Sequence, residues 1–131
     1  MSYLLDTDTC VLALRHHAGV LRRLKSLSPD DVAVTSLTEA ELGYGARQSR
    51  DPVGSSKSVA ALLEPINRLP FDSEAAERYS ELRLALRAHP ISERDLLTAS
   101  VALTHRITLV TGNREFARVA GLALEDWTTP G

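Results

Sequence analysis

Acidic and amide side chains stand at or just beyond the ends of several apolar segments in this chain. Asp6 ends the first apolar run, and Glu41 lies on the helix expected after the second. Asp95 starts the helix that leads into the last clear strand, and Asn113 and Glu115 follow that strand. Groups that follow the strands of an open parallel sheet meet at one edge, so these side chains are predicted to gather there. Clustered carboxylates repel one another unless a cation compensates, and all-oxygen ligands suit Mg²⁺ or Mn²⁺.

Two of these acids have a purely structural alternative. Asp6 stands beside Thr7 and Asp8, which are good helix N-caps, and it could serve only to help them cap the first helix. Asp95 follows Ser92 by three positions and falls in the first turn of its helix, where any acid is favoured by the helix dipole. For both residues the structural role and the metal role are open at this point.

Glu41 has to be distinguished from Glu39, which lies two residues earlier. Ser36 and Glu39 have the spacing of a capping box, S-x-x-E, which explains Glu39 without any chemistry. Glu41 has no such role. It shares a helix face with Leu37, Ala40 and Tyr44. An ionisable group on an otherwise apolar stripe indicates a functional site, and the alternative is a partly exposed or paired carboxylate.

The elements that would position these groups follow from the apolar pattern. Strands are expected at residues 3–5, 32–35, 68–71, 107–111 and 122–124. Helices are expected at about residues 8–16, 20–27, 36–48, 59–67, 73–88 and 93–105, with a mobile polar loop at 51–58. Because the strands are uniformly apolar and alternate with helices, the pattern predicts a parallel sheet covered by helices on both faces.

Length and composition are typical of a small globular protein. With 131 residues, of which 44% are hydrophobic, the chain is expected to form a single domain over residues 1–131. No basic segment precedes the first apolar run, so we expect no signal peptide or membrane anchor and a cytoplasmic location. The one cysteine, Cys10, excludes an internal disulfide and is expected to be buried.

Charge and motifs narrow the possible functions further. The net charge of −2 argues against a general nucleic-acid coat, but it allows an enzyme that holds nucleic acid through a metal and a few arginines. The four histidines make no ligand pair with one another or with the cysteine. The sequence has neither a glycine-rich phosphate loop nor a G-x-S-x-G segment. The carboxylates therefore remain the main candidates for chemistry.

Segments along almost the whole chain match, in order, those of one known protein family. They are YLLDT at residues 3–7, TSLTEAEL with YGA at 35–46, PISERDLLTA at 90–99, LVTGNREF at 109–116 and the stretch from GL to DW at 121–127. The corresponding family patterns include L-L-D-T-N, S-x-x-T-x-x-E-L-x-x-G and I-x-x-x-D-x-x-I-A-A. The chain therefore resembles the PIN-domain ribonucleases of the VapC toxin type.

The resemblance implies a three-layer α/β/α fold with a central, mostly parallel sheet. It places the family's acidic positions on Asp6, Glu41 and Asp95. At the fourth position Asn113 stands where many relatives have Asp, and Glu115 is the nearest carboxylate. We expect Asn113 to lie in the site with Glu115 behind it, because distance from the strand end limits reach. The alternative is that Glu115 supplies the missing metal ligand.

The resemblance also implies an activity and partners. The expected activity is endonucleolytic cleavage of RNA assisted by Mg²⁺ or Mn²⁺. The expected partners are a second copy of the chain and a small antitoxin protein whose tail covers the active site. An arginine from such a tail could pair with the acidic cluster in place of the metal.

Two other functions remain as alternatives. Asp6 and Asp8, which replaces the usual Asn of the VapC pattern, also resemble the D-x-D motif of haloacid-dehalogenase-type phosphatases. There Asp6 would be the nucleophile and Asp8 the acid and base. That chemistry needs a lysine near the phosphoryl group, and Lys25 and Lys57 lie in poor places for it. The second alternative is a degenerate PIN module that binds metal or RNA without cleaving it.

Overall fold

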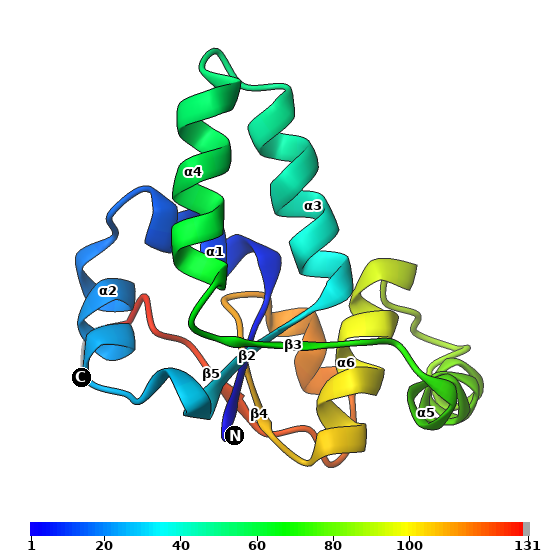
Figure 1. The fold of residues 1–131 in the computed structure, drawn as a ribbon. Coiled ribbons are helices and arrows are strands. Elements are labelled where there is room, and N and C mark those ends of the chain that lie inside the picture. Colours follow the sequence, from blue (N-terminus) through cyan, green and yellow to red (C-terminus); the bar gives the residue numbers. More distant parts are fainter. Residues whose placement is uncertain (130–131) are drawn as a thin grey trace.

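Parallel strands run through the middle of the structure, a computed structural model that describes residues 1–129 (Figure 1). The strands are β1 (Tyr3–Leu5), β2 (Val32–Thr35), β3 (Asn67–Leu69), β4 (Thr108–Val110) and β5 (Leu124–Glu125). Their order in the sheet is β3-β2-β1-β4-β5, and every neighbouring pair is parallel. The first strand of the chain therefore lies at the centre of the sheet, between β2 and β4.

Helices connect the strands, as parallel pairing requires. They are α1 (Thr7–Leu14), α2 (Ala18–Lys25), α3 (Ser36–Arg47), α4 (Pro52–Leu63), α5 (Ser73–Ala85) and α6 (Glu93–His105). Short 3₁₀ helices, η1 (Pro29–Asp31) and η2 (Arg114–Arg118), precede β2 and follow β4. In residues 1–129, no helix combines the length and the apolar composition needed to cross a membrane.

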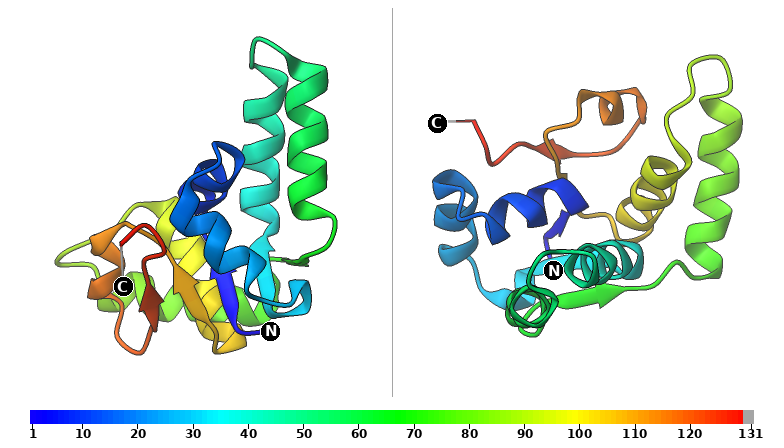
Figure 2. Two further views of the ribbon diagram at one scale, coloured as in Figure 1. Left: turned by 90° about the vertical axis from the view of Figure 1, so that its left-hand side faces the viewer. Right: turned by 90° about the horizontal axis from the view of Figure 1, so that it is seen from above.

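Alternate residues of the strands point to opposite faces of the sheet, and each face has its own core. One core contains Leu4, Ala33 and Leu109 with Ala99 of α6 and Phe116 of η2. The other contains Leu5, Val34 and Val110 with Cys10 of α1 and Leu42 of α3. Helices thus cover both faces (Figure 2), which confirms the predicted three-layer architecture. The burial of Cys10 is confirmed as well.

The segment predicted to be a mobile polar loop, residues 51–58, is mostly helical instead. Asp51 caps α4, and its carboxylate accepts a hydrogen bond from the Gly54 backbone N–H at 3.1 Å. Pro52 occupies the first helical position, where proline needs no N–H partner and its φ already suits a helix. The helix predicted at 59–67 therefore spans Pro52–Leu63. With α3 it forms a hairpin that projects from the body of the protein (Figures 1 and 2).

The start of α3 also differs from the prediction. Thr35 rather than Ser36 is the N-cap, and its hydroxyl accepts a hydrogen bond from the Thr38 backbone N–H at 3.0 Å. The cap lies one residue early because Thr35 is the extended last residue of β2, whereas Ser36 is already helical. The capping box predicted for Glu39 is therefore wrong. Its carboxylate instead approaches Nε of Arg68 at 3.4 Å.

Candidate active site

A small cleft opens where β1 and β4 end, beside the starts of α1 and α6. Its volume is about 20 Å³, and it is lined by Asp6, Thr7, Asp8, Arg94, Asp95, Thr98, Asn113 and Phe116. A space of this size holds about one water molecule or one ion. Asp6 follows β1, Asp95 lies in the first turn of α6, and Asn113 follows β4. The fold thus brings together three of the segments that were predicted to share a site.

Asp6 caps a helix and lines the cleft at the same time. Its backbone N–H donates to the Val110 carbonyl at 3.1 Å, which ties the end of β1 to β4. Its carboxylate accepts a hydrogen bond from the Thr9 N–H at 2.8 Å, so Asp6 caps α1 in place of the predicted Thr7 and Asp8. Burial raises the pKa of Asp6, and the charge of Asp8 adds to this rise. A cation in the cleft would relieve both effects.

Asp95 and Asn113 are joined by a hydrogen bond. The side-chain amide of Asn113 donates to Oδ2 of Asp95 at 3.1 Å. The amide oxygen of Asn113 accepts a hydrogen bond from the Glu115 backbone N–H at 3.0 Å, so the amide group is held at both ends. Glu115 is exposed, and its side chain is not among those that line the cleft. Of the two candidates for the fourth position, the structure brings Asn113 to the cleft and leaves Glu115 outside it.

Glu41 stands beside the cleft rather than in its lining. Oγ1 of Thr7 donates to Oε1 of Glu41 at 2.7 Å, and Nη1 of Arg94 donates to Oε2 at 2.9 Å. The carboxylate thus joins α3 to α1 and α6. The apolar stripe around Glu41 is not a core-facing one, because Ala40 and Tyr44 on that face are exposed. The buried face of α3 contains Thr38, Leu42 and Ala46 instead.

Arg94 is a candidate functional residue that the sequence reasoning missed. Its side chain lines the cleft and pairs with Glu41. The hydrogen bond to Glu41 raises the pKa of Arg94, and the charges of Asp95 and Asp8 act in the same direction. The guanidinium is therefore a permanent positive charge among the acids. The one signal in the sequence was a cation directly before Asp95.

Comparison with known proteins decides the family. A family model described as "PIN domain" matches residues 3–122. The chain belongs to the PIN-domain family. This confirms the resemblance drawn from the ordered sequence segments.

Similar proteins match this PIN domain along almost its whole length. Ribonuclease VapC2 of Rickettsia felis is 34% identical over 97% of this chain and 98% of its own length. The tRNA(fMet)-specific endonuclease VapC of Shigella flexneri is 30% identical over 98% of this chain and 99% of its own length. A chain in the crystal structure of VapBC2 from Rickettsia felis, bound to a DNA fragment from their promoter, superimposes with a TM-score of 0.89. It has 33% identity over 97% of this chain and 99% of that chain.

The cleft of this PIN domain offers the kind of ligand atoms that a hard divalent cation prefers. Its acidic and amide side chains offer oxygen atoms, which suit Mg²⁺ or Mn²⁺. Among the described residues, no three carboxylate, histidine or cysteine side chains stand close enough together to hold an ion. Mg²⁺ is commonly bound through only one or two carboxylates and keeps several waters. Asp6 and Asp95 therefore fit such a site as they stand, whereas Glu41 would have to leave Arg94 to join them.

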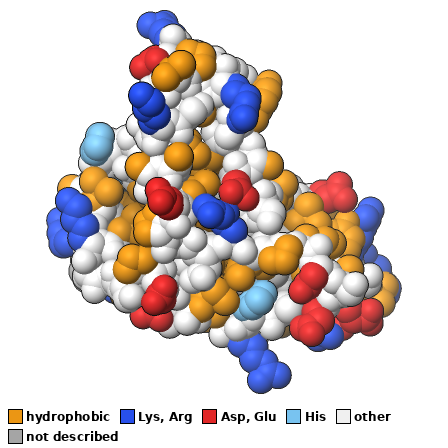
Figure 3. Space-filling view, in the orientation of Figure 1, with side chains coloured by type: hydrophobic (Ala, Val, Ile, Leu, Met, Phe, Trp, Pro, Cys, Tyr) orange, Lys and Arg blue, Asp and Glu red, His pale blue; other side chains and the backbone are white. Residues whose placement is uncertain are grey.

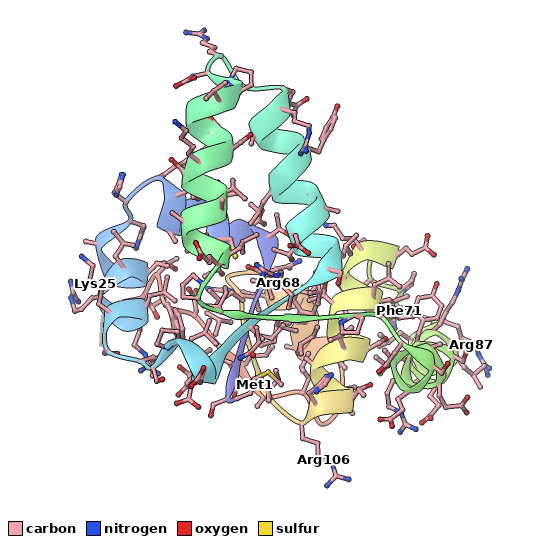
Figure 4. The ribbon with its side chains drawn as sticks, in the orientation of Figure 1. Met1, Lys25, Arg68, Phe71, Arg87 and Arg106 are labelled. Carbon is pink, nitrogen blue, oxygen red and sulfur yellow. The ribbon has the colours of Figure 1, made fainter. Side chains whose placement is uncertain are left out.

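The lining of the cleft also bears on the phosphatase alternative. Asp6 and Asp8 both line it, but no lysine does so within residues 1–129. Lys25 points outward from the end of α2 (Figure 4), and Lys57 belongs to α4. Together with the family match, this geometry favours a PIN-type site over a phosphatase that uses Asp6 as its nucleophile.

A wider groove lies next to the cleft, between α1 and the α3–α4 hairpin. Its volume is about 640 Å³, and Thr7 lines both the groove and the cleft. Val11, Leu42 and Val59 supply apolar wall, and Glu41, which accepts a hydrogen bond from Thr7, also lines the groove. Figure 3 shows hydrophobic side chains gathered at the base of the hairpin and a mixture of basic, acidic and hydrophobic side chains at its tip. A polypeptide segment in this groove would therefore lie directly beside the acidic site.

Proposed function

We propose that this PIN domain is a Mg²⁺- or Mn²⁺-dependent RNA endonuclease and the toxin of a toxin–antitoxin pair. The observation that carries the proposal is the cleft, in which Asp6, Asp95 and Asn113 come together from distant segments of the chain. Relatives that are 30% and 34% identical over nearly the whole chain are named endonuclease and ribonuclease, which supports RNA as the substrate.

In the proposed reaction the residues of the chain bind and orient. Asp6 and Asp95 would hold the cation, and the buried position of Asp6 favours one because desolvation penalises an uncompensated carboxylate. Asn113 keeps Asp95 in place through their 3.1 Å hydrogen bond. Glu41 would join as a third carboxylate, and Glu115 would act only from outside the cleft. When bound, the cation would polarise a phosphoryl oxygen and help a water molecule to lose a proton.

The groove beside the cleft is the proposed seat of a small antitoxin protein. A solved relative with 27% identity and a TM-score of 0.67, VapBC-5 from Mycobacterium tuberculosis, is a member of the VapBC family of toxin–antitoxin systems, which supports a partner of this kind. Apolar side chains of the partner would cover Val11, Leu42 and Val59, and a basic side chain would reach Glu41. A segment so placed would keep RNA from the cleft. We place the protein in the cytoplasm, where RNA is available.

RNA cleavage by the purified protein tests the proposal. With Mg²⁺ or Mn²⁺ the protein should cut RNA internally, and EDTA should stop the reaction. A phosphomonoester assay run beside it tests the phosphatase alternative. Binding of metal or RNA without cleavage would identify a degenerate PIN module and would overturn the proposed activity.

A further inference from the structure

Arg94 places a positive charge inside an otherwise acidic cleft. It lies in the first turn of α6, directly before Asp95, and lines the cleft together with Asp6 and Asp8. Its guanidinium does not pair with these neighbours but reaches across to α3, where Nη1 donates to Oε2 of Glu41 at 2.9 Å. The ion pair therefore connects one wall of the cleft to a carboxylate that stands outside it.

The contacts of Glu41 show what this ion pair does. Thr7 donates to one carboxylate oxygen at 2.7 Å and Arg94 to the other at 2.9 Å, so each oxygen already has a protein partner. The hydroxyl of Thr7 also lies 2.9 Å from that of Thr38, which gives it a second partner. Only the bond from Arg94 joins two opposite charges, because the Thr7 hydroxyl is neutral. Moving Glu41 into the cleft therefore requires breaking its ion pair with Arg94 as well as its bond with Thr7.

We propose that Arg94 is a positioning residue that competes with the divalent cation for Glu41: it holds Glu41 away from the cleft until an ion binds at Asp6 and Asp95. The inference rests on the function proposed above. An ion held by Asp6 and Asp95 would repel the guanidinium and attract Glu41, so the ion pair and the complete metal site would exclude each other.

Exposure makes the exchange possible. The side chain of Arg94 is 55% exposed and that of Glu41 is 26% exposed, so neither is locked by a surrounding core. Once Glu41 turns to the ion, the guanidinium is free to face solvent or a phosphate of the RNA. A merely structural ion pair at this exposure would add little stability and would leave metal affinity unchanged.

Calorimetric titration of the full chain with Mn²⁺ distinguishes an Arg94 that competes with the ion from an Arg94 that only forms a structural ion pair. Arg94→Gln should bind Mn²⁺ about fivefold more tightly than the wild type, the factor expected for loss of one partly exposed ion pair. Arg94→Lys keeps the charge and should stay near the wild type. Thermal melting shows whether each variant folds. If Arg94→Gln does not fold, Arg94→Met, which keeps the aliphatic part of the side chain, is used in its place.

Arg114→Gln is the matched control for charge. It removes one positive charge from η2, next to Asn113, but within residues 1–129 Arg114 forms no ion pair with the acids. Its Mn²⁺ affinity should change by less than about twofold, because exposed unpaired charges are screened by solvent. An equal gain in Arg94→Gln and Arg114→Gln would show a general field effect and would overturn the specific role of Arg94.

The decisive measurement is the same substitution in a Glu41→Gln background. If Arg94 acts through Glu41, Arg94→Gln should no longer tighten Mn²⁺ binding there. If Arg94→Gln binds Mn²⁺ no better than a wild type that binds Mn²⁺ and cleaves RNA, this inference fails and the proposed function stands. If the wild type neither binds Mn²⁺ nor cleaves RNA, the proposed function fails and the inference fails with it.

Discussion

Asp6 is both a helix cap and a proposed metal ligand, and one substitution separates these roles. Asp6→Asn should keep the cap, because Asn caps helices as well as Asp does. It should reduce RNA cleavage more than about 100-fold, since even partners of metal ligands cost about 10- to 100-fold when removed. Cleavage of a labelled RNA with Mg²⁺ measures this. A variant that cleaves at a near wild-type rate would remove Asp6 from the site.

The same substitution should stabilise the metal-free protein at neutral pH. Because the folded pKa of Asp6 lies above its ordinary value of 3.8, the folded state binds more protons than the unfolded state between the two values. The free energy of unfolding therefore falls as the pH rises through this interval and stays lower above it. The Asp6→Asn variant has no carboxyl group at this position, so its free energy of unfolding does not fall in this way. In melting experiments with EDTA its advantage should be present at pH 7, fade as the pH falls through this interval, and be lost below pH 3.8.

Glu41 and Glu39 lie two residues apart, but their substitution should have different effects on RNA cleavage. Glu41→Gln should lower cleavage at least about tenfold, as expected for a carboxylate that takes part in a metal site. Glu39→Gln removes only an exposed contact with Arg68 and should change cleavage less than about twofold. Cleavage rates of the two variants, measured side by side, test the assignment. The reverse ranking would place the functional face of α3 on the other side.

Substitutions of Asn113 and Glu115 should differ in effect because Asn113 lines the cleft and Glu115 does not. Asn113→Ala should weaken both Mn²⁺ binding and cleavage more than Glu115→Gln, because it removes the partner of Asp95. Asn113→Asp puts another carboxylate beside Asp95 and should tighten Mn²⁺ binding. Metal titration and cleavage of the three variants measure these effects. If Glu115→Gln is the most damaging, Glu115 moves into the cleft when the ion binds.

At the scale of elements, helix caps place the functional groups. Asp6, Ser92 and Asn113 each cap a helix that begins at the cleft. A cap marks the residue where an extended chain turns into a helix, so its side chain lies near the exit of a strand or loop. Polar residues that local structure already requires are thereby brought to the edge of the sheet, where a metal site can use them.

The cap of α3 gives a test at this scale. Thr35→Ala should lower the free energy of unfolding by about 1–2 kcal/mol, because the Thr38 N–H loses its partner. Ser36→Ala should change it by less than about 0.5 kcal/mol, as is usual for an exposed position without such a contact. Urea denaturation of the two variants measures the difference. A larger loss for Ser36→Ala would restore the capping box that the structure replaces.

At the scale of the whole molecule, exposed apolar side chains point to assembly. Large hydrophobic residues remain exposed on the α3–α4 hairpin and around α5: Tyr44, Val53, Phe71 and Leu84. Exposed apolar residues mark a surface that another chain covers where they form one contiguous patch. The purified protein should be a dimer by light scattering, and co-expression with its neighbouring gene should yield a complex with a small partner. A monomer at every concentration would contradict the dimer.

The sequence by itself determined the architecture and the segments that carry most of the candidate site. A strand buried on both faces must be a continuous apolar run, so β1, β2 and β4 were visible from composition alone. The segments that carry Asp6, Asp95 and Asn113 follow from that pattern, because chain order places them after a strand or at the start of the next helix. The prediction of a loop at residues 51–58 was wrong because Asp and Pro are common both in loops and at helix starts. Asp51 and Pro52 in fact begin α4.

Only the tertiary structure decided how the groups meet. The pair of Glu41 and Arg94 joins residues 53 positions apart in the chain, and it depends on the directions in which α3 and α6 leave the sheet. The choice between Asn113 and Glu115 depends on a turn in which the Asn113 N–H donates to the Thr111 hydroxyl and the Glu115 N–H donates to the Asn113 amide oxygen. The amide N–H of Asn113 is then left to donate to Asp95. Side-chain direction at this level follows from packing between distant elements. Periodicity along the chain carries no information about side-chain direction. The position of Arg94 inside the acidic cleft could therefore be seen only in the tertiary structure.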